Sequence, residues 1–184
     1  MSEEKKSVLT SEVLEELQEY IQEHYESEPK YSSIYDACMG IPDILNFEKD
    51  THKGIEFSGE KEARSLEDVI EEIGESFHDQ LFRYIDMSGM TDVEVYKRAN
   101  IDRKLFSKIR SNPAYHPRKN TILALAIALR LSLDETIDLL CRAEYALSPS
   151  SKTDLIVRFF IEKGIYDIFA INEALDQYGE AILS

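Results

Sequence analysis

Apolar residues recur at helical spacing along most of the chain. Between Thr10 and Tyr25 they stand three and four positions apart, which places them on one side of a helix, while the other side is mainly glutamate. Ser11 stands where a helix N-cap is expected. The sequence therefore predicts an amphipathic helix with an acidic outer face and an inner face made of Val13, Leu14, Leu17, Tyr20, Ile21, His24 and Tyr25.

From residue 75 onwards, start and stop signals separate a series of predicted helices. Residues 121–131 are apolar on nearly all sides, which indicates a buried central helix. The predicted helices cover residues 76–89, 91–99, 102–111, 121–131, 132–147, 151–163 and 165–178. The expected caps are Thr91, Asp102, Ser132 with Glu135, and Ser151 with Asp154, and the expected ends are Gly89, Asn100, Gly164 and Gly179.

Residues 27–65 have a less regular pattern. Short helices are predicted around residues 31–39 and 42–46, then a loop with a short strand at 54–57, and a helix from Ser65 to Gly74. The whole pattern predicts an all-α fold, divided into an acidic, mostly helical N-terminal region at residues 1–74 and a helical domain at residues 75–184. We expect one core to contain Phe106, Ile109, Ile122, Leu125, Ala128 and Leu129.

The charge of the chain is unevenly distributed. The formal net charge is −15, of which residues 1–74 carry −13 and residues 75–184 carry −2. Within the second region, residues 97–119 contain eight basic side chains against Asp102 alone, a local net charge of +7. Such asymmetry favours a nucleic-acid or other acidic partner for the basic segment. With two cysteines, no secretory signal and no apolar run near the roughly 18 residues of a membrane span, we expect a cytoplasmic protein with no membrane contact.

The basic segment coincides with a predicted pair of short helices joined by a tight turn, the geometry of a helix-turn-helix. Asn100 supplies a turn residue that accepts positive φ. The side chains expected to face inward are Val95, Ala99, Ile101, Leu105, Phe106 and Ile109. The second helix directs Arg103, Lys104, Ser107 and Lys108 outward, where they are suited to phosphates and guanine edges.

Residues 91–140 resemble the five-helix lambda-repressor-like (Cro/repressor, XRE) DNA-binding domain, on the segments TDVEVYKRANIDRKLFSKI and ILALAIALRLSLDETIDLL. The longer region 75–184 is similar to a module that follows the ADP-ribose-binding macrodomain in proteins of the Firmicutes. The resemblance implies that Thr91 caps the first motif helix, that residues 102–110 form the recognition helix, and that two helices extend the bundle at its C-terminal end. The N-terminal region lacks the glycine-rich loops of a macrodomain and is too short to be one.

The motif departs from the family pattern at several points. Asp92 stands where DNA-binding members usually carry a glutamine, and its negative charge would repel phosphate. Tyr96 replaces a small residue that lets the two helices approach closely, and the loop at residues 112–120 is long.

The sequence contains no motif for catalysis or metal binding. The histidines His24, His52, His78 and His116 have no metal-ligand spacing, and no glycine-rich phosphate loop or nucleophile elbow occurs. Cys141 is expected in the core, and Cys38 has no evident base near it. We therefore expect a protein that is not an enzyme and that has no cofactor and no metal site.

These patterns predict a DNA-binding regulatory protein that acts as a homodimer on double-stranded DNA. Arg103, Lys104, Ser107 and Lys108 are expected to contact the duplex, with phosphate contacts from Lys97, Arg98, Arg110, Arg118 and Lys119. The tail residues Phe159, Phe160, Ile168 and Ile171 are expected to complete the core or to form the dimer. The alternative is a non-enzymatic interaction or inhibitor protein, in which residues 1–74 dock a basic partner such as a toxin, a nuclease or a phage-defence component.

Overall fold

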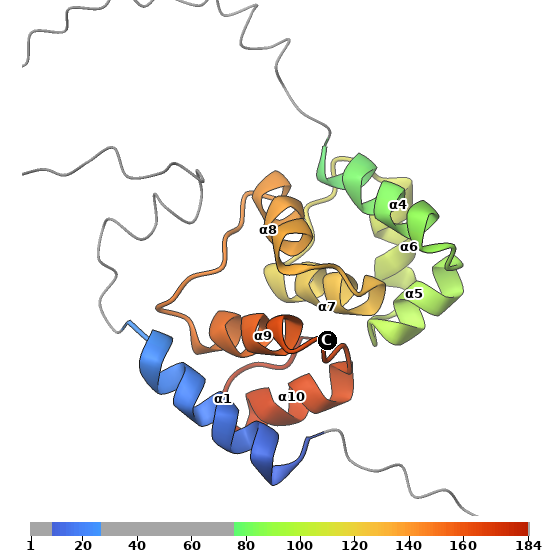
Figure 1. The fold of residues 1–184 in the computed structure, drawn as a ribbon. Coiled ribbons are helices and arrows are strands. Elements are labelled where there is room, and N and C mark those ends of the chain that lie inside the picture. Colours follow the sequence, from blue (N-terminus) through green and yellow to red (C-terminus); the bar gives the residue numbers. More distant parts are fainter. Residues whose placement is uncertain (1–8, 27–75, 184) are drawn as a thin grey trace, which may run out of the picture.

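The computed structural model describes residues 9–26 and 76–183, and all regular secondary structure in these ranges is helical (Figure 1). This confirms the all-α class for the described part of the chain. The strand and helices expected between residues 27 and 74 lie outside the described residues. The described helices are α1 (Ser11–His24), α4 (Phe77–Ser88), α5 (Asp92–Arg98), α6 (Arg103–Ser111), α7 (Lys119–Leu129), α8 (Leu133–Arg142), α9 (Lys152–Glu162) and α10 (Ile168–Gln177).

Most of the predicted helix ends are confirmed. The backbone is left-handed at Gly89, Asn100, Gly164 and Gly179, with φ between 54° and 71°. After Asn100, Gly164 and Gly179, paired amide–carbonyl bonds close a Schellman motif that satisfies the last carbonyls of the helix. The capping boxes of Thr91 with Glu94 and of Ser132 with Glu135 are complete.

Several predicted boundaries were wrong. Thr10, not Ser11, caps α1, and α10 begins only at Ile168 because the Asp167 carboxylate caps it there. Helix α8 stops at Arg142, well before residue 147, because Glu144 adopts a left-handed conformation with φ of 59°. Helix α7 begins at Lys119, two residues earlier than expected, without a side-chain cap.

Helix α7 lies at the centre of the molecule. Every residue from Thr121 to Leu129 is buried, and α4, α5, α8 and α10 all pack against the helix. In Figure 1, α4, α5 and α6 lie on one side of α7, and α9 and α10 lie on the other. Full burial of one Leu or Ile side chain contributes about 1.5 to 3 kcal/mol, so enclosing this helix contributes strongly to the stability of the fold. The predicted core is confirmed, since the six residues expected in it are all buried in one cluster.

Helix α1 belongs to the same core as the helices of the second region. It packs on α9, where Leu17 has 0% of its surface exposed and Ile21 is also buried (Figure 1). The Tyr20 hydroxyl donates a hydrogen bond of 3.0 Å to Glu162 Oε2, and Lys163 Nζ lies 2.5 Å from Glu16 Oε2. Residues 9–26 of the N-terminal region are therefore part of the packed body formed by residues 76–183.

Helices α9 and α10 supply the last part of the core. Phe159, Phe160, Ile168 and Ile171 are all buried in the single copy of the protein. Of the two roles expected for these residues, completing the core is the one that the structure assigns. Among the helices of residues 9–26 and 76–183, none has the length and apolarity needed to cross a membrane.

Replacing Leu17 with Ala should lower the free energy of unfolding by about 2 to 5 kcal/mol, because a fully enclosed side chain is lost from the α1–α9 contact. Denaturant unfolding followed by circular dichroism measures this change. The neighbouring exposed residue provides a control, since Gln18→Ala should have little effect. An unchanged unfolding midpoint for the Leu17 variant would show that α1 does not pack in this core.

Burial and the hydrogen bond to Glu162 raise the pKa of Tyr20 to about 12. A tyrosine in the unfolded chain ionises near 10, so the folded state holds this proton more tightly. The resulting stability is complete below pH 10 and is lost as the pH rises through about 12. Tyr20→Phe should therefore reduce the decline in stability between pH 10 and 12, and an absorbance titration should show the loss of one phenol that ionises near pH 12. An equally steep decline in the variant would contradict this assignment.

Candidate nucleic-acid interface

Helices α5 and α6 are joined by a short turn that the sequence places at Asn100. The Ile101 amide donates to the Tyr96 carbonyl at 3.0 Å and the Asn100 amide to the Lys97 carbonyl at 3.2 Å, which ends α5 sharply. Asp102 then caps α6, with its carboxylate 2.6 Å from the Lys104 amide nitrogen. On the inner side Val95, Ala99, Ile101, Phe106 and Ile109 are buried as predicted, whereas Leu105 is only half-buried.

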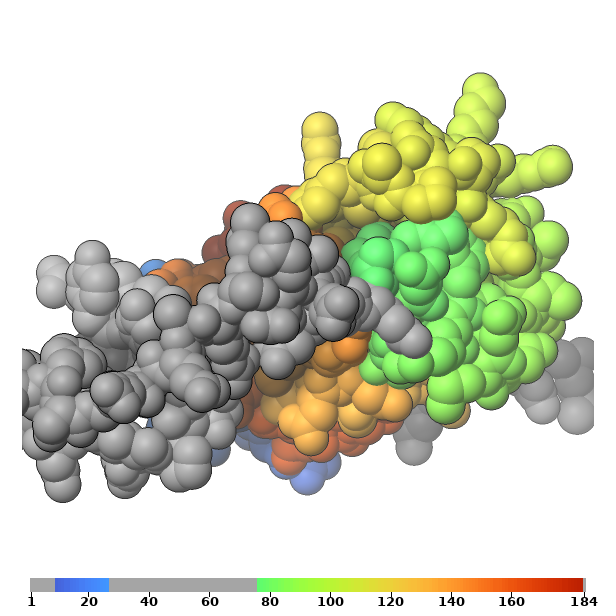
Figure 2. Space-filling model, turned by 90° about the horizontal axis from the view of Figure 1, so that it is seen from above, coloured from blue at the N-terminus to red at the C-terminus, as the bar shows by residue number. Residues whose placement is uncertain are grey.

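The outer side of α6 is exposed and basic. Arg103, Lys104, Ser107 and Lys108 all face solvent. Figure 2 shows long side chains standing out from the lime and yellow part of the surface, the colours of residues around α6 and the loop that follows. The Lys108 ammonium lies 4.0 Å from the centre of the Tyr115 ring, so this loop supports the helix through a cation–π contact.

Three further cations flank α6. Lys97 and Arg98 are exposed on α5, and Arg118 is exposed at the start of α7. Within the described residues, no carboxylate forms a salt bridge with Lys97, Arg98, Arg103, Lys104, Lys108 or Arg118. Arg98 does have an acid one turn away on α5, since hydrogen bonds from Thr91 and the charge of Arg98 lower the pKa of the Glu94 carboxyl. We call these six residues together with Ser107 the basic face. In a chain of net charge −15, such a set of cations without salt bridges is the main electrostatic feature of this surface.

Two residues that the sequence placed at the interface are already paired with carboxylates. Arg110 Nη1 lies 2.8 Å from Asp92 Oδ1, and its guanidinium stacks over Phe82 at 4.7 Å from the ring centre. Lys119 Nζ lies 2.5 Å from Asp154 Oδ2, and the Asp154 side chain is only 3% exposed. Arg110 and Lys119 therefore lie beside the basic face with their charges compensated inside the protein, and their contact with a nucleic acid stays a prediction.

The departures from the family pattern have structural explanations. The negative charge of Asp92 is compensated by Arg110. The Tyr96 ring packs against Phe106, with centroids 6.0 Å apart, in the space between α5 and α6. In the long loop, His116 Nε2 donates to the Ala143 carbonyl at 2.6 Å, so this ring contacts α8 and not the basic face.

A groove of about 810 Å³ adjoins the basic face. It lies between the start of α6 and the start of α7 and is lined by Leu105, Tyr115, Arg118 and Tyr145 among others. Residues 181–183 also line it, and the Asn120 side-chain amide donates there to the Ile182 carbonyl at 3.2 Å. The candidate interface thus combines an exposed basic helix with a neighbouring groove of mixed polarity.

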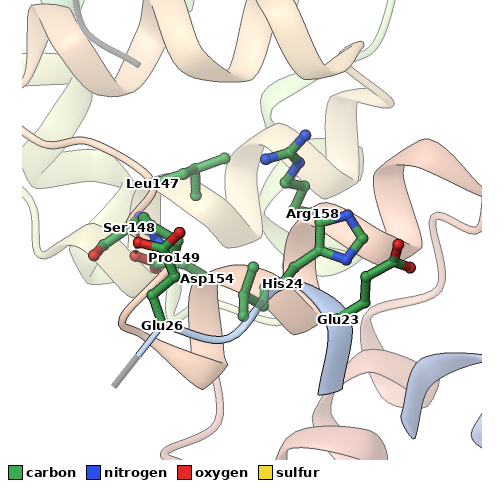
Figure 3. Close-up of a pocket in the computed structure, with 9 residues that line it drawn as sticks. Glu23, His24, Glu26, Leu147, Ser148, Pro149, Asp154 and Arg158 are labelled. Carbon is green, nitrogen blue, oxygen red and sulfur yellow. Dashed lines mark hydrogen bonds between the residues drawn. The ribbon is translucent and has the colours of Figure 1, made fainter. Parts of the chain in front are cut away.

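A smaller cavity of about 290 Å³ lies between the end of α1 and the segment that leads into α9. Figure 3 shows Arg158 and His24 on one side of it, and Glu26 beside Ser148 and Pro149 on the other. Two of its polar side chains have partners, since His24 Nδ1 donates to the Tyr20 carbonyl at 2.8 Å and Arg158 pairs with Glu162 at 2.8 Å. Among the described residues, Glu26 Oε2 is buried there without a hydrogen-bond partner.

Among residues 9–26 and 76–183, no three His, Cys, Asp or Glu side chains form a group that could hold a metal ion. Cys141 was expected in the core, but it is exposed on α8, because Leu139 and Leu140 fill the buried side of that helix.

Sequence reasoning missed the partners of Arg110 and Lys119. Asp92 stands 18 positions before Arg110 and Asp154 stands 35 positions after Lys119, so no local spacing signals either pair. Asp154 was expected to complete a capping box with Ser151. The Ser151 hydroxyl does cap α9, but the Asp154 carboxylate accepts from the Ser148 amide at 2.8 Å and binds Lys119.

Comparison with protein-family models, with curated proteins and with solved structures finds no match for this chain. The resemblance to the lambda-repressor-like domain therefore stays a prediction made from the residues.

Lys119→Ala should lower the free energy of unfolding by about 2 to 3 kcal/mol, because it leaves the buried Asp154 carboxylate without its cation. The cost lies below that of a fully enclosed pair because the Lys119 side chain is 25% exposed. Thermal unfolding tests this. Removing the partly exposed Arg142–Asp138 pair by Asp138→Ala is the control and should cost about 0.5 kcal/mol. Equal, small losses for both variants would show that Lys119 has no structural role.

Proposed function

We propose that the protein binds double-stranded DNA through α5, the Asn100 turn and α6, used as a helix-turn-helix, and acts as a DNA-binding regulator. The observation that carries this proposal is the basic face, whose cations form no salt bridge within the described residues although the chain has an excess of acids. The phosphates of a duplex can neutralise such a group of arginines and lysines, and their condensed counterions are released in the process.

The arrangement of charge supports an approach to DNA from one side. The exposed glutamates of α1, which are Glu12, Glu15, Glu19 and Glu23, lie on the helix farthest from α6 in Figure 1. At physiological ionic strength, charges more than about 8 Å apart are largely screened from one another. Acids on α1 therefore oppose the approach of α6 to phosphate only weakly.

The positions on α6 suggest different roles for its side chains. Arg103 and Lys104 stand in the first turn, the part of a recognition helix that reads base edges in the major groove, and Ser107 lies one turn later. Lys97, Arg98 and Arg118 flank the helix and are suited to the phosphates on either side. Lys108, held over Tyr115, adds a further phosphate contact.

A homodimer is part of the proposal. One recognition helix reads few base pairs and buries little surface, so regulators of this kind usually pair two copies on two half-sites. Because the apolar tail residues are buried inside the single copy, the dimer must use another surface of the protein.

Binding to a duplex, measured by fluorescence anisotropy over a range of salt concentrations, tests the proposal. The logarithm of affinity should fall linearly with the logarithm of salt, and Arg118→Ala should reduce the slope by about 0.9. Arg103→Ala should reduce discrimination between preferred and random sequences by about 1 to 3 kcal/mol.

Lys163→Ala is the matched control, because it removes the same charge from a cation that pairs with Glu16 in the part of the molecule remote from α6. Its salt slope should equal that of the unmodified protein. If no duplex binds at low salt, the DNA proposal is wrong, and binding of a basic protein by the acidic α1 surface becomes the better hypothesis.

A further inference from the structure

Arg110 is the point where three helices meet. Its guanidinium, at the last turn of α6, binds Asp92 on α5 at 2.8 Å and covers the Phe82 ring on α4 at 4.7 Å. Its backbone carbonyl accepts a hydrogen bond of 3.1 Å from His78 Nε2, also on α4. These contacts involve both the side chain and the main chain of one residue.

The ion pair joins complementary helix ends. Asp92 occupies the first turn of α5, where a negative charge is favoured by the helix dipole, and Arg110 occupies the last turn of α6, where a positive charge is favoured. At the opposite ends of these two helices, the Asn100 turn joins the last residues of α5 to the first residues of α6. The two helices are therefore connected at both of their ends.

We propose that the Asp92–Arg110 pair is a clasp that sets the orientation of α6 on α5, and that Arg110 is a positioning residue and not a phosphate contact. The inference rests on the proposed DNA-binding function for its purpose, but the clasp itself is a property of the free protein. The ion pair has a second effect. The positive charge of Arg110 compensates the Asp92 carboxylate, which would otherwise repel phosphate at the start of α5.

The alternative is that Arg110 leaves Asp92 when DNA arrives and binds a phosphate itself. The two ideas predict opposite effects for Asp92→Asn, which removes the partner of Arg110 with almost no change in shape. If Arg110 contacts phosphate, Asp92→Asn should strengthen DNA binding because Arg110 no longer has to leave a carboxylate, and the salt slope should not change because the number of phosphate contacts is the same. If the clasp positions α6, the same variant should weaken binding by about two- to five-fold, the factor that corresponds to loss of a partly exposed ion pair, with an unchanged slope.

A first experiment uses the protein without DNA. Hydrogen exchange is measured for the amides at the end of α6 in four proteins: unmodified, Asp92→Asn, Arg110→Ala and the double variant. The clasp predicts that either single variant speeds local exchange by about two- to five-fold, and that the double variant adds little, because both remove the same interaction. Amides of α9 are the internal control and should not change. Independent, additive effects, or no effect in α6, would overturn the clasp.

A second experiment measures DNA affinity against salt for the same variants. Arg110→Ala should weaken binding to the preferred sequence more than to random duplex and leave the slope unchanged. Arg118→Ala should instead lower the slope by about 0.9. A slope change for Arg110→Ala equal to that for Arg118→Ala would show that Arg110 binds phosphate. If no DNA binds at all, the proposed function fails while the exchange experiment still decides whether the clasp exists.

Discussion

The enclosure of α7 is the constraint on which the rest of the structure depends. A helix that is apolar on all sides cannot remain in water, so other helices must surround it. Helices α4, α5, α8 and α10 pack against α7, and α9, which packs on α8 and α10, in turn receives α1. The positions of α5 and of the basic α6 that packs on it are consequences of this enclosure.

Charge is arranged around that core in two ways. Some cations hold the fold together, as Lys119 does by linking the start of α7 to the start of α9 through Asp154. Others on α5, α6 and the start of α7 form no salt bridge within the described residues and make up the basic face. The proposed function depends on this division, because a cation that is paired with a carboxylate must first give up that partner before it neutralises a phosphate and releases counterions. Arg110 shows this division most clearly, because it lies beside the basic face but is paired with Asp92 in the proposed clasp.

Helix content and most helix ends follow from local chemistry, and these were predictable. Thr91, Asp102 and Ser132 cap their helices through side chains a few positions from the amides they bind, and Gly89 and Asn100 adopt the left-handed backbone that glycine and asparagine tolerate. Arg130 and Glu144 adopt the same conformation without any such signal. The residues that follow them, Leu131 and Tyr145, pack on the core, so this packing fixes the end of each helix and overrides the local preference.

The sequence by itself determined that the described helices form, that α7 is central, and that Arg103, Lys104, Ser107 and Lys108 face outward, because these features depend on periodicity and on contacts within one helical turn. Only the tertiary structure decided which cations remain available. Arg110 and Lys119 lie in the same basic segment as Arg103 and Arg118, so the sequence alone predicts an interface role for all four. In the structure, however, Arg110 and Lys119 each lie within 3 Å of a carboxylate from another helix. That outcome depends on how distant helices approach each other around α7, and a one-dimensional pattern contains no distance between residues that are far apart in the chain.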